Sequence, residues 1–156
     1  MRLIHFDDDD NFVPDEALQS NGWIKSHPEL AITPSFFWKP NGVWVSDEDA
    51  TNPWSVFCRR TNHHLGKYKY FIELENDANV LFISTVEELL KFDEDFNGGT
   101  GEVTIPWKNV AEVFSGIIIT PYLFECKVYP RWYEPWDCAS GCIWDPQAIE
   151  KSIRLD

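Results

Sequence analysis

Short runs typical of β-strands alternate irregularly with short helical patterns along this chain, and this alternation limits the folds that it can adopt. The runs RLIHF, GVWVS, YKYFIEL and GIIIT are rich in β-branched and aromatic residues, as strands usually are. Helical patterns do not follow each strand in turn, so the regular βαβ rhythm of a parallel sheet is absent. The sequence therefore predicts an α+β fold with a mixed or mostly antiparallel sheet and short flanking helices.

The same patterns assign the individual elements. Polar residues between the third and fourth strands predict a turn, so we expect these two strands to lie side by side. Residues 21–41 hold prolines and aromatic residues without a regular pattern, which indicates a long irregular loop of the kind that is often functional. Strands are expected at 2–6, 42–46, 68–74, 79–83, 116–120, 142–144 and 152–155, and helices at 15–20, from residue 53, at 85–92 and at 106–114.

Two of the expected helices carry further signals. Trp54, Phe57 and Cys58 have helical spacing, which predicts that they share a buried face. Ser84 is followed three residues later by Glu87. This is the capping-box pattern, and it predicts that the helix 85–92 begins directly after Ser84.

Length and charge narrow the class of protein. The 156 residues fit a single domain spanning 1–156. The net charge of −13 disfavours binding to nucleic acid or anionic membranes and favours a protein partner with a basic surface. The most apolar segment, 114–124, is too short to span a membrane, and the acidic run at 7–10 replaces the apolar stretch of an export signal. We therefore expect a cytoplasmic protein.

The cysteines and glycines give weaker indications. Four cysteines are too few and too unevenly spaced for a disulfide framework, so we expect reduced thiols. They also lack the paired C-x₂-C spacing of structural zinc, and we expect no metal. The residues considered for zinc are Cys58, Cys138, Cys142, His63 and His64. The stretch NGGTG at 97–101 follows a helix and lacks the Lys-Ser/Thr of a P-loop, which indicates a flexible connection.

Four residues distant in sequence are candidates for chemistry, although each has a structural explanation. His5 ends the first strand, Trp44 and Ser46 lie in the second, and Asp137 lies in the late turn. A strand histidine is usually structural, a strand tryptophan is usually core, and an aspartate before small residues usually forms a turn. Singly, none of them indicates an active site.

The order and context of these residues resemble the small ADP-ribosyltransferase fold. The resemblance covers most of the chain: a first strand ending in His (LIHF), a strand ending in a small polar residue (GVWVS), a helix (PWSVFCRR), the strands YKYFIEL and NVLFI, and the strand GIIIT before WDCASGCIW. The chain is similar to compact phage and bacterial ADP-ribosyltransferases, an anti-CRISPR enzyme among them. These join a first-strand His to a late Asp before a small-residue turn.

The resemblance implies a mono-ADP-ribosyltransferase that takes NAD as its substrate and transfers ADP-ribose to a protein. Cleavage of the nicotinamide–ribose bond develops positive charge on the ribose, which a fixed carboxylate stabilises. Asp137 is the expected catalytic carboxylate, with Glu134 and Glu125 as alternatives. The expected cofactor-binding residues are His5 for the adenosine-side ribose, Trp44 and either Tyr122 or Trp136 for the nicotinamide faces, Ser46 for the carboxamide or ribose, and Lys39 for the pyrophosphate.

Two alternatives stay open. Water can replace the protein acceptor, which would make the chain an NAD glycohydrolase. The acidic composition also fits an inhibitor or immunity protein that mimics nucleic acid and occupies the basic cleft of a nuclease or toxin. In that case the aromatic residues of the tail, 129–145, would anchor the interface, and His5 would be structural.

Overall fold

The elements follow the predicted patterns closely. A computed structural model describes residues 1–14 and 39–156. The predicted helix at 15–20 and most of the loop at 21–41 lie outside these residues. The strands are β1 (Leu3–Asp7), β2 (Val43–Asp47), β3 (Tyr68–Leu74), β4 (Val80–Ile83), β5 (Gly116–Ile119), β6 (Ser140–Ile143) and β7 (Ile149–Leu155). The helices are α2 (Trp54–Thr61), α3 (Val86–Asn97) and α4 (Trp107–Val113), with short 3₁₀ turns at Phe124–Cys126, Arg131–Tyr133 and Pro146–Ala148.

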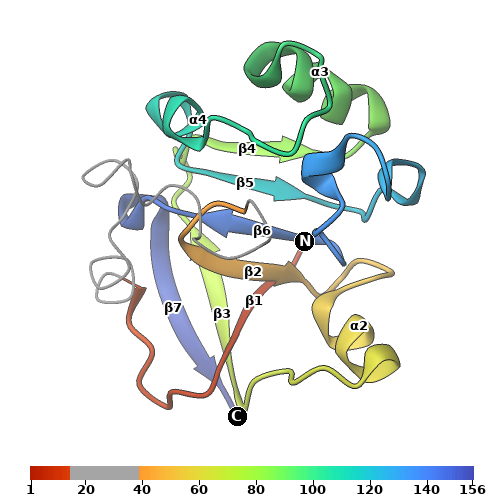
Figure 1. The fold of residues 1–156 in the computed structure, drawn as a ribbon. Helices are drawn as coiled ribbons and strands as arrows, with labels where there is room; N and C mark the ends of the chain where they lie inside the picture. Colours follow the sequence, from red (N-terminus) through yellow and green to blue (C-terminus); the bar gives the residue numbers. More distant parts are fainter. Residues whose placement is uncertain (15–38) are drawn as a thin grey trace.

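In the described part of the chain, the seven strands form one twisted sheet in the order β4-β5-β6-β2-β1-β3-β7 (Figure 1). β4 and β5 run parallel, whereas the other neighbouring strands run antiparallel. The predicted α+β class with a mixed, mostly antiparallel sheet is confirmed. No helix among the described residues is long and apolar enough to cross a membrane.

The expectation that β3 and β4 lie side by side is wrong. β3 lies between β1 and β7, and β4 lies at the opposite edge of the sheet beside β5 (Figure 1). The turn does form, because the backbone N–H of Ala78 donates to the carbonyl of Glu75. Both edges of β3 are already paired, with β1 and with the seven-residue strand β7. The apolar run of β4 pairs instead with the equally apolar β5.

The predicted start of α3 is off by one residue. Its N-cap is Thr85, whose hydroxyl oxygen accepts from the backbone N–H of Glu88 at 3.1 Å. The Glu88 carboxylate in turn accepts from the backbone N–H of Ser84 at 3.2 Å. Ser84 and Thr85 are each followed by a glutamate three residues later, so the capping-box pattern alone does not distinguish the two registers.

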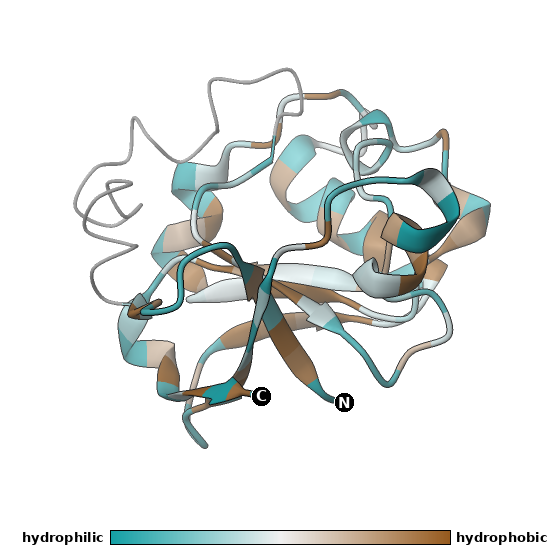
Figure 2. Cartoon of the chain, turned by 90° about the horizontal axis from the view of Figure 1, so that it is seen from below, coloured by the Kyte–Doolittle hydropathy of each residue, from teal (hydrophilic) through white to brown (hydrophobic). Residues whose placement is uncertain are grey.

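Two hydrophobic clusters lie on opposite faces of the sheet. Ile117 and Ile119 belong to one cluster and Ile118 to the other, as expected from the alternation of side chains along a strand. The first cluster includes the buried faces of α3 and α4, which lie beside β4 and β5 (Figure 1). In Figure 2 the hydrophobic colours concentrate on the central strands, and much of the hydrophilic colour lies on the loops and outer helix faces.

Four of the five aromatic residues of the tail belong to this core, and the fifth, Tyr129, is exposed. Trp132, Tyr133, Trp136 and Trp144 have no exposed surface, and all four pack in the first cluster. The Trp132 Nε1–H donates to the buried carboxylate of Asp93 at 3.0 Å. The prediction that tail aromatic residues anchor an interface, made for the inhibitor alternative, is therefore wrong for these four.

The predicted buried face of α2 is only partly buried. Cys58 is enclosed, but Trp54 and Phe57 are half-buried and stack on each other with ring centroids 5.3 Å apart. The helix packs at the end of β2 rather than beneath the sheet (Figure 1). Helical spacing shows which residues share a face, but it does not show whether a second layer covers that face.

Candidate functional site

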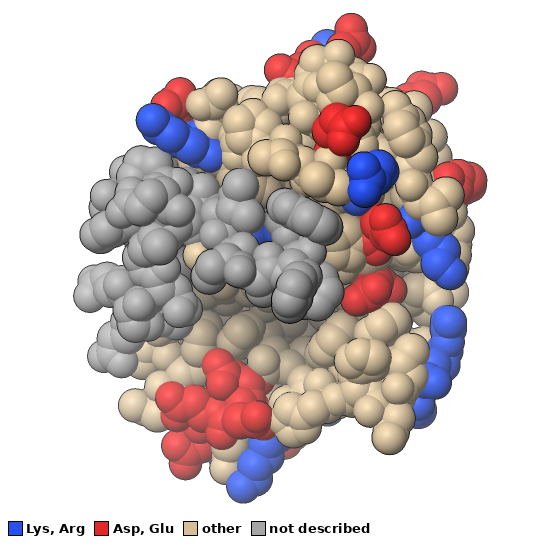
Figure 3. All heavy atoms as spheres, viewed as in Figure 1, with Lys and Arg blue, Asp and Glu red and all other residues tan. Residues whose placement is uncertain are grey.

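A cavity opens where the sheet splits between β1 and β2. These two strands pair through Leu3 with Asp47 and Ile4 with Ser46, whereas β1 continues to pair with β3 as far as Asp7. The cavity beside this short ladder has a volume of about 490 Å³, within the range typical of small-molecule sites. Figure 3 shows the molecule hollowed on this face, next to a group of acidic side chains.

Five of the seven predicted site residues line this cavity. They come from segments far apart in sequence: β1, the segment that leads into β2, β2 itself, and the turn before β6. Tyr122 and Trp136 do not line it. The predicted residues are His5, Lys39, Trp44, Ser46 and Asp137, and the lining is completed by Ile4, Phe6, Asp7, Asp8, Val45, Trp54, His64, Leu65, Gly66, Cys138 and Ser140.

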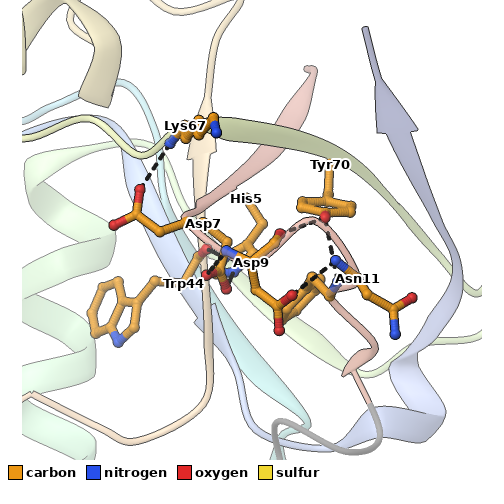
Figure 4. A network of polar contacts seen from close by, with 9 residues as sticks. His5, Asp7, Asp9, Asn11, Trp44, Lys67 and Tyr70 are labelled. Carbon is orange, nitrogen blue, oxygen red and sulfur yellow. Dashed lines mark hydrogen bonds and ion pairs between the residues drawn. The ribbon is translucent and has the colours of Figure 1, made fainter.

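His5 connects the two separating strands. One ring nitrogen, Nδ1, donates to the Trp44 carbonyl at 2.7 Å, and the other, Nε2, lies 3.1 Å from the Asp7 carboxylate (Figure 4). Both partners are acceptors, so each contact is a hydrogen bond where the ring nitrogen carries the hydrogen. The ring also packs on Phe12, with centroids 4.2 Å apart. A contact between His5 and a ribose stays a prediction, and it would require Nε2 to exchange Asp7 for a ribose hydroxyl.

The acidic tract at the mouth of the cavity is held by several hydrogen bonds. Burial alone would raise the pKa of Asp7, but the backbone N–H of Asp9 and the hydrogen bond and charge of His5 lower it overall. Asp8 accepts from His64 at 2.8 Å and from the backbone N–H of Lys67 at 3.0 Å, and these bonds lower the pKa of Asp8. Asp7 and Asp8 are therefore held in place and ionised beside the opening.

The indole of Trp44 forms one wall of the cavity. It meets Trp136 edge to face, with centroids 5.1 Å apart and an interplanar angle of 67°. The Lys39 ammonium nitrogen lies 4.9 Å from the centre of the Trp44 ring and 6.0 Å from that of Trp136. The ammonium of Lys39 thus lies over the ring to which the sequence assigned the nicotinamide.

Asp137 lies between this cavity and a second, smaller one. Its side chain is exposed, yet desolvation by the surrounding protein raises the pKa of its carboxyl, against the attraction of Lys39 and His63. The second cavity has a volume of about 100 Å³, and Tyr122 lines it together with Asp137 and Arg60. The predicted site residues therefore fall into two adjoining spaces that share Asp137.

Ser46 is engaged within the chain. Its hydroxyl donates to the Glu48 carboxylate at 2.6 Å and accepts from the backbone N–H of Trp54 at 2.8 Å. The second contact satisfies an N–H at the start of α2, a group that helix geometry leaves unpaired. Ser46 therefore attaches α2 to β2 at the cavity wall, and the predicted contact with NAD stays a prediction.

Comparisons with known proteins identify no relative of this chain. The chain has no significant match among protein-family models, curated proteins or solved structures. The site must therefore be interpreted from its own residues.

Sequence reasoning missed several lining residues. Trp54 was expected in the core, and Asp7, Asp8 and His64 were not expected to contact NAD, yet all four line the cavity. A signal was present for the aspartates, because the acidic run 7–10 directly follows the first expected strand. The contact between His64 and Asp8 spans 56 residues, and no local pattern reveals it.

The remaining candidates either lie outside the two cavities or are unreactive at neutral pH. The alternative carboxylates Glu125 and Glu134 are exposed and line neither cavity. All four cysteines are free and buried. Burial raises the pKa of Cys138, which lines the cavity, to about 11, so its thiol is protonated at neutral pH. Among the described residues, no three His, Cys, Asp or Glu side chains are grouped to hold a metal ion.

Proposed function

We propose that this chain is a mono-ADP-ribosyltransferase that binds NAD in the cavity between β1 and β2. One observation carries the proposal: His5, Lys39, Trp44, Ser46 and Asp137, selected from separate segments of the sequence, line one cavity. If these five residues had only separate structural roles, nothing would require them to line the same cavity. The volume of about 490 Å³ also suits a ligand of this class.

In the proposed reaction, the bond between C1′ of the ribose and the nicotinamide nitrogen breaks, and its electron pair leaves with the nicotinamide. A nucleophile of the target protein forms the new bond to C1′ and loses its proton to solvent. The Asp137 carboxylate stabilises the positive charge that develops on the ribose. The face of Trp44 holds the nicotinamide ring by stacking and cation–π attraction.

His5 and Ser46 have positioning roles in this proposal. Through its bond to the Trp44 carbonyl, His5 fixes the backbone that presents the indole. Ser46 fixes the start of α2 and with it Trp54, which also lines the cavity. Groups held in this way need little reorganisation when the ligand binds.

The charge of the molecule supports a protein with a basic surface as the acceptor. The net charge is −13, and acidic side chains gather beside the hollow in Figure 3. Such a surface accelerates the approach of a basic partner and repels nucleic acid. A cytoplasmic target in a bacterial or phage conflict fits this proposal, and hydrolysis of NAD is the same chemistry with water as the acceptor.

The test is NAD binding and turnover by the purified chain and by Asp137→Asn. We expect the wild type to bind NAD in calorimetry and to release nicotinamide in the presence of a cell extract that supplies acceptors. Asp137→Asn keeps the shape of the side chain but removes the charge, so turnover should fall by about 100-fold or more while binding persists. Nicotinamide release is followed by chromatography.

Two further variants make this result specific. Asp77→Asn removes an exposed carboxylate from the turn between β3 and β4 and should leave turnover unchanged. Glu134→Gln tests the alternative carboxylate, and a loss there with full activity in Asp137→Asn would move the catalytic role to Glu134. If folded wild-type protein binds no NAD at millimolar concentration, the proposal is wrong, and the acidic inhibitor becomes the better interpretation.

A further inference from the structure

The ammonium group of Lys39 occupies a position in the cavity that suits a cation. Its nitrogen lies 4.9 Å from the centre of the Trp44 ring and 6.0 Å from that of Trp136, within the range of cation–π attraction. The two rings meet edge to face, and the Lys39 nitrogen lies over both of them in the corner that they form. Trp136 has no exposed surface while Lys39 is in this position. Asp137 adds a negative charge that favours the ammonium form of Lys39, against the burial that lowers its pKa.

The rest of the cavity favours the same kind of ligand. Asp7, Asp8 and Asp137 contribute carboxylates to the lining. The first two are hydrogen-bonded to the lining histidines His5 and His64. Among the described lining residues, Lys39 is the sole lysine or arginine. A pocket with aromatic faces and an excess of carboxylates attracts a cation and repels an anion. Without the Lys39 side chain, the corner would be an aromatic and acidic site with no lysine or arginine among its described lining residues.

We propose that the corner between Trp44 and Trp136 is a binding site for a planar organic cation, and that Lys39 fills it until the ligand displaces the Lys39 side chain. Lys39 is then a built-in competitor and not the contact for a pyrophosphate that the sequence predicts. For the nicotinamide ring of NAD, the inference rests on the proposed function. For organic cations in general, it rests on the geometry of the corner alone.

The two roles of Lys39 predict opposite effects when its charge is removed. In Lys39→Met the competing side chain loses its charge and its cation–π contacts, so affinity for 1-methylnicotinamide, a planar cation, should rise about tenfold. Nicotinamide, which has nearly the same shape but no charge, should gain much less. Both affinities are measured by calorimetry on the folded full chain. Lys39→Gln serves as the second variant in case Lys39→Met does not fold.

Three controls assign the effect to the corner. Lys108→Met removes the same charge from the exposed side of α4 and should leave the affinity for the cation unchanged. In the Lys39→Met background, Trp44→Leu should abolish the gain, because the aromatic face is lost. Lys39→Arg keeps a positive charge and should not show the gain.

The outcomes separate this inference from the proposed function. Equal or weaker binding of 1-methylnicotinamide to both Lys39→Met and Lys39→Gln overturns the inference. If NAD binds the wild type but loses affinity in Lys39→Met, the transferase proposal stands and Lys39 contacts the pyrophosphate. If no variant binds NAD but Lys39→Met gains affinity for 1-methylnicotinamide, the cation site stands and the transferase proposal fails.

Discussion

Asp137 and Lys39 both lie where the surrounding protein disfavours their charges. Desolvation raises the pKa of the Asp137 carboxyl and lowers that of the Lys39 ammonium, and their mutual attraction opposes both shifts. Charged groups that lower the stability of the folded chain are typical of functional sites. They are retained there because they interact favourably with a ligand. This property of single residues can be tested without any ligand.

Asp137→Asn should leave the free energy of unfolding unchanged or increase it at pH 7. The pKa of Asp137 is raised in the folded state, so its ionised form opposes folding above that pKa. The effect should disappear as the pH falls below the unfolded value of 3.8, where both states are protonated. Chemical denaturation of both proteins between pH 3 and 8 measures the difference. Clear destabilisation of Asp137→Asn at pH 7 would contradict this assignment.

At the scale of elements, the caps decide where helices begin. Thr85 and Glu88 exchange hydrogen bonds at the start of α3, and Gly98 ends the helix in a left-handed conformation with φ of 64°. Loss of an N-cap hydroxyl leaves a backbone N–H without its acceptor. Substitution of the residue that forms this cap should therefore lower the free energy of unfolding of the domain.

Thr85→Ala should lower the free energy of unfolding by about 1 kcal/mol. Ser84→Ala is the matched control, because Ser84 contributes its backbone N–H and not its side chain to this cap. Its effect should be much smaller, since the substitution retains that N–H. Urea denaturation monitored by circular dichroism compares the two variants. A larger loss in Ser84→Ala would restore the cap at the position that the sequence first indicates.

The cavity depends on how two strands pair, and not on the identity of single residues. β1 and β2 are both apparent in the sequence, but their ladder ends at Ile4 and Ser46. Beyond it, His5 and Trp44 meet through a ring nitrogen and a carbonyl. The sequence correctly predicts the strands but not where they part. Strand composition reports local preference, whereas register and pairing depend on partners that are distant along the chain.

The whole molecule carries a large excess of negative charge. The net charge is −13, and such self-repulsion destabilises a compact state. Salt screens this repulsion, because the Debye length falls from about 30 Å at 0.01 M to about 8 Å at 0.15 M ionic strength. The ion pairs among the described residues are mostly exposed, so screening them costs little.

Raising NaCl from 0.01 to 0.15 M should therefore raise the unfolding temperature. A gain of about 1 kcal/mol corresponds to roughly 2–4 °C in a chain of this size. Differential scanning calorimetry measures the shift, and an equal osmolarity of a neutral sugar controls for effects unrelated to charge. A lower unfolding temperature in salt would mean that attractive ion pairs outweigh the net repulsion.

The sequence alone determined the α+β class, most element positions and the residues around which the site is proposed. These follow from local physics, since β-branched runs, helical spacing and caps act within a few residues. Tertiary structure alone decided that β4 pairs with β5, that Trp132, Trp136 and Trp144 are core, and that Lys39 lies over Trp44. These depend on contacts between residues far apart in the chain, and such contacts form only when burial of the whole apolar surface selects one arrangement.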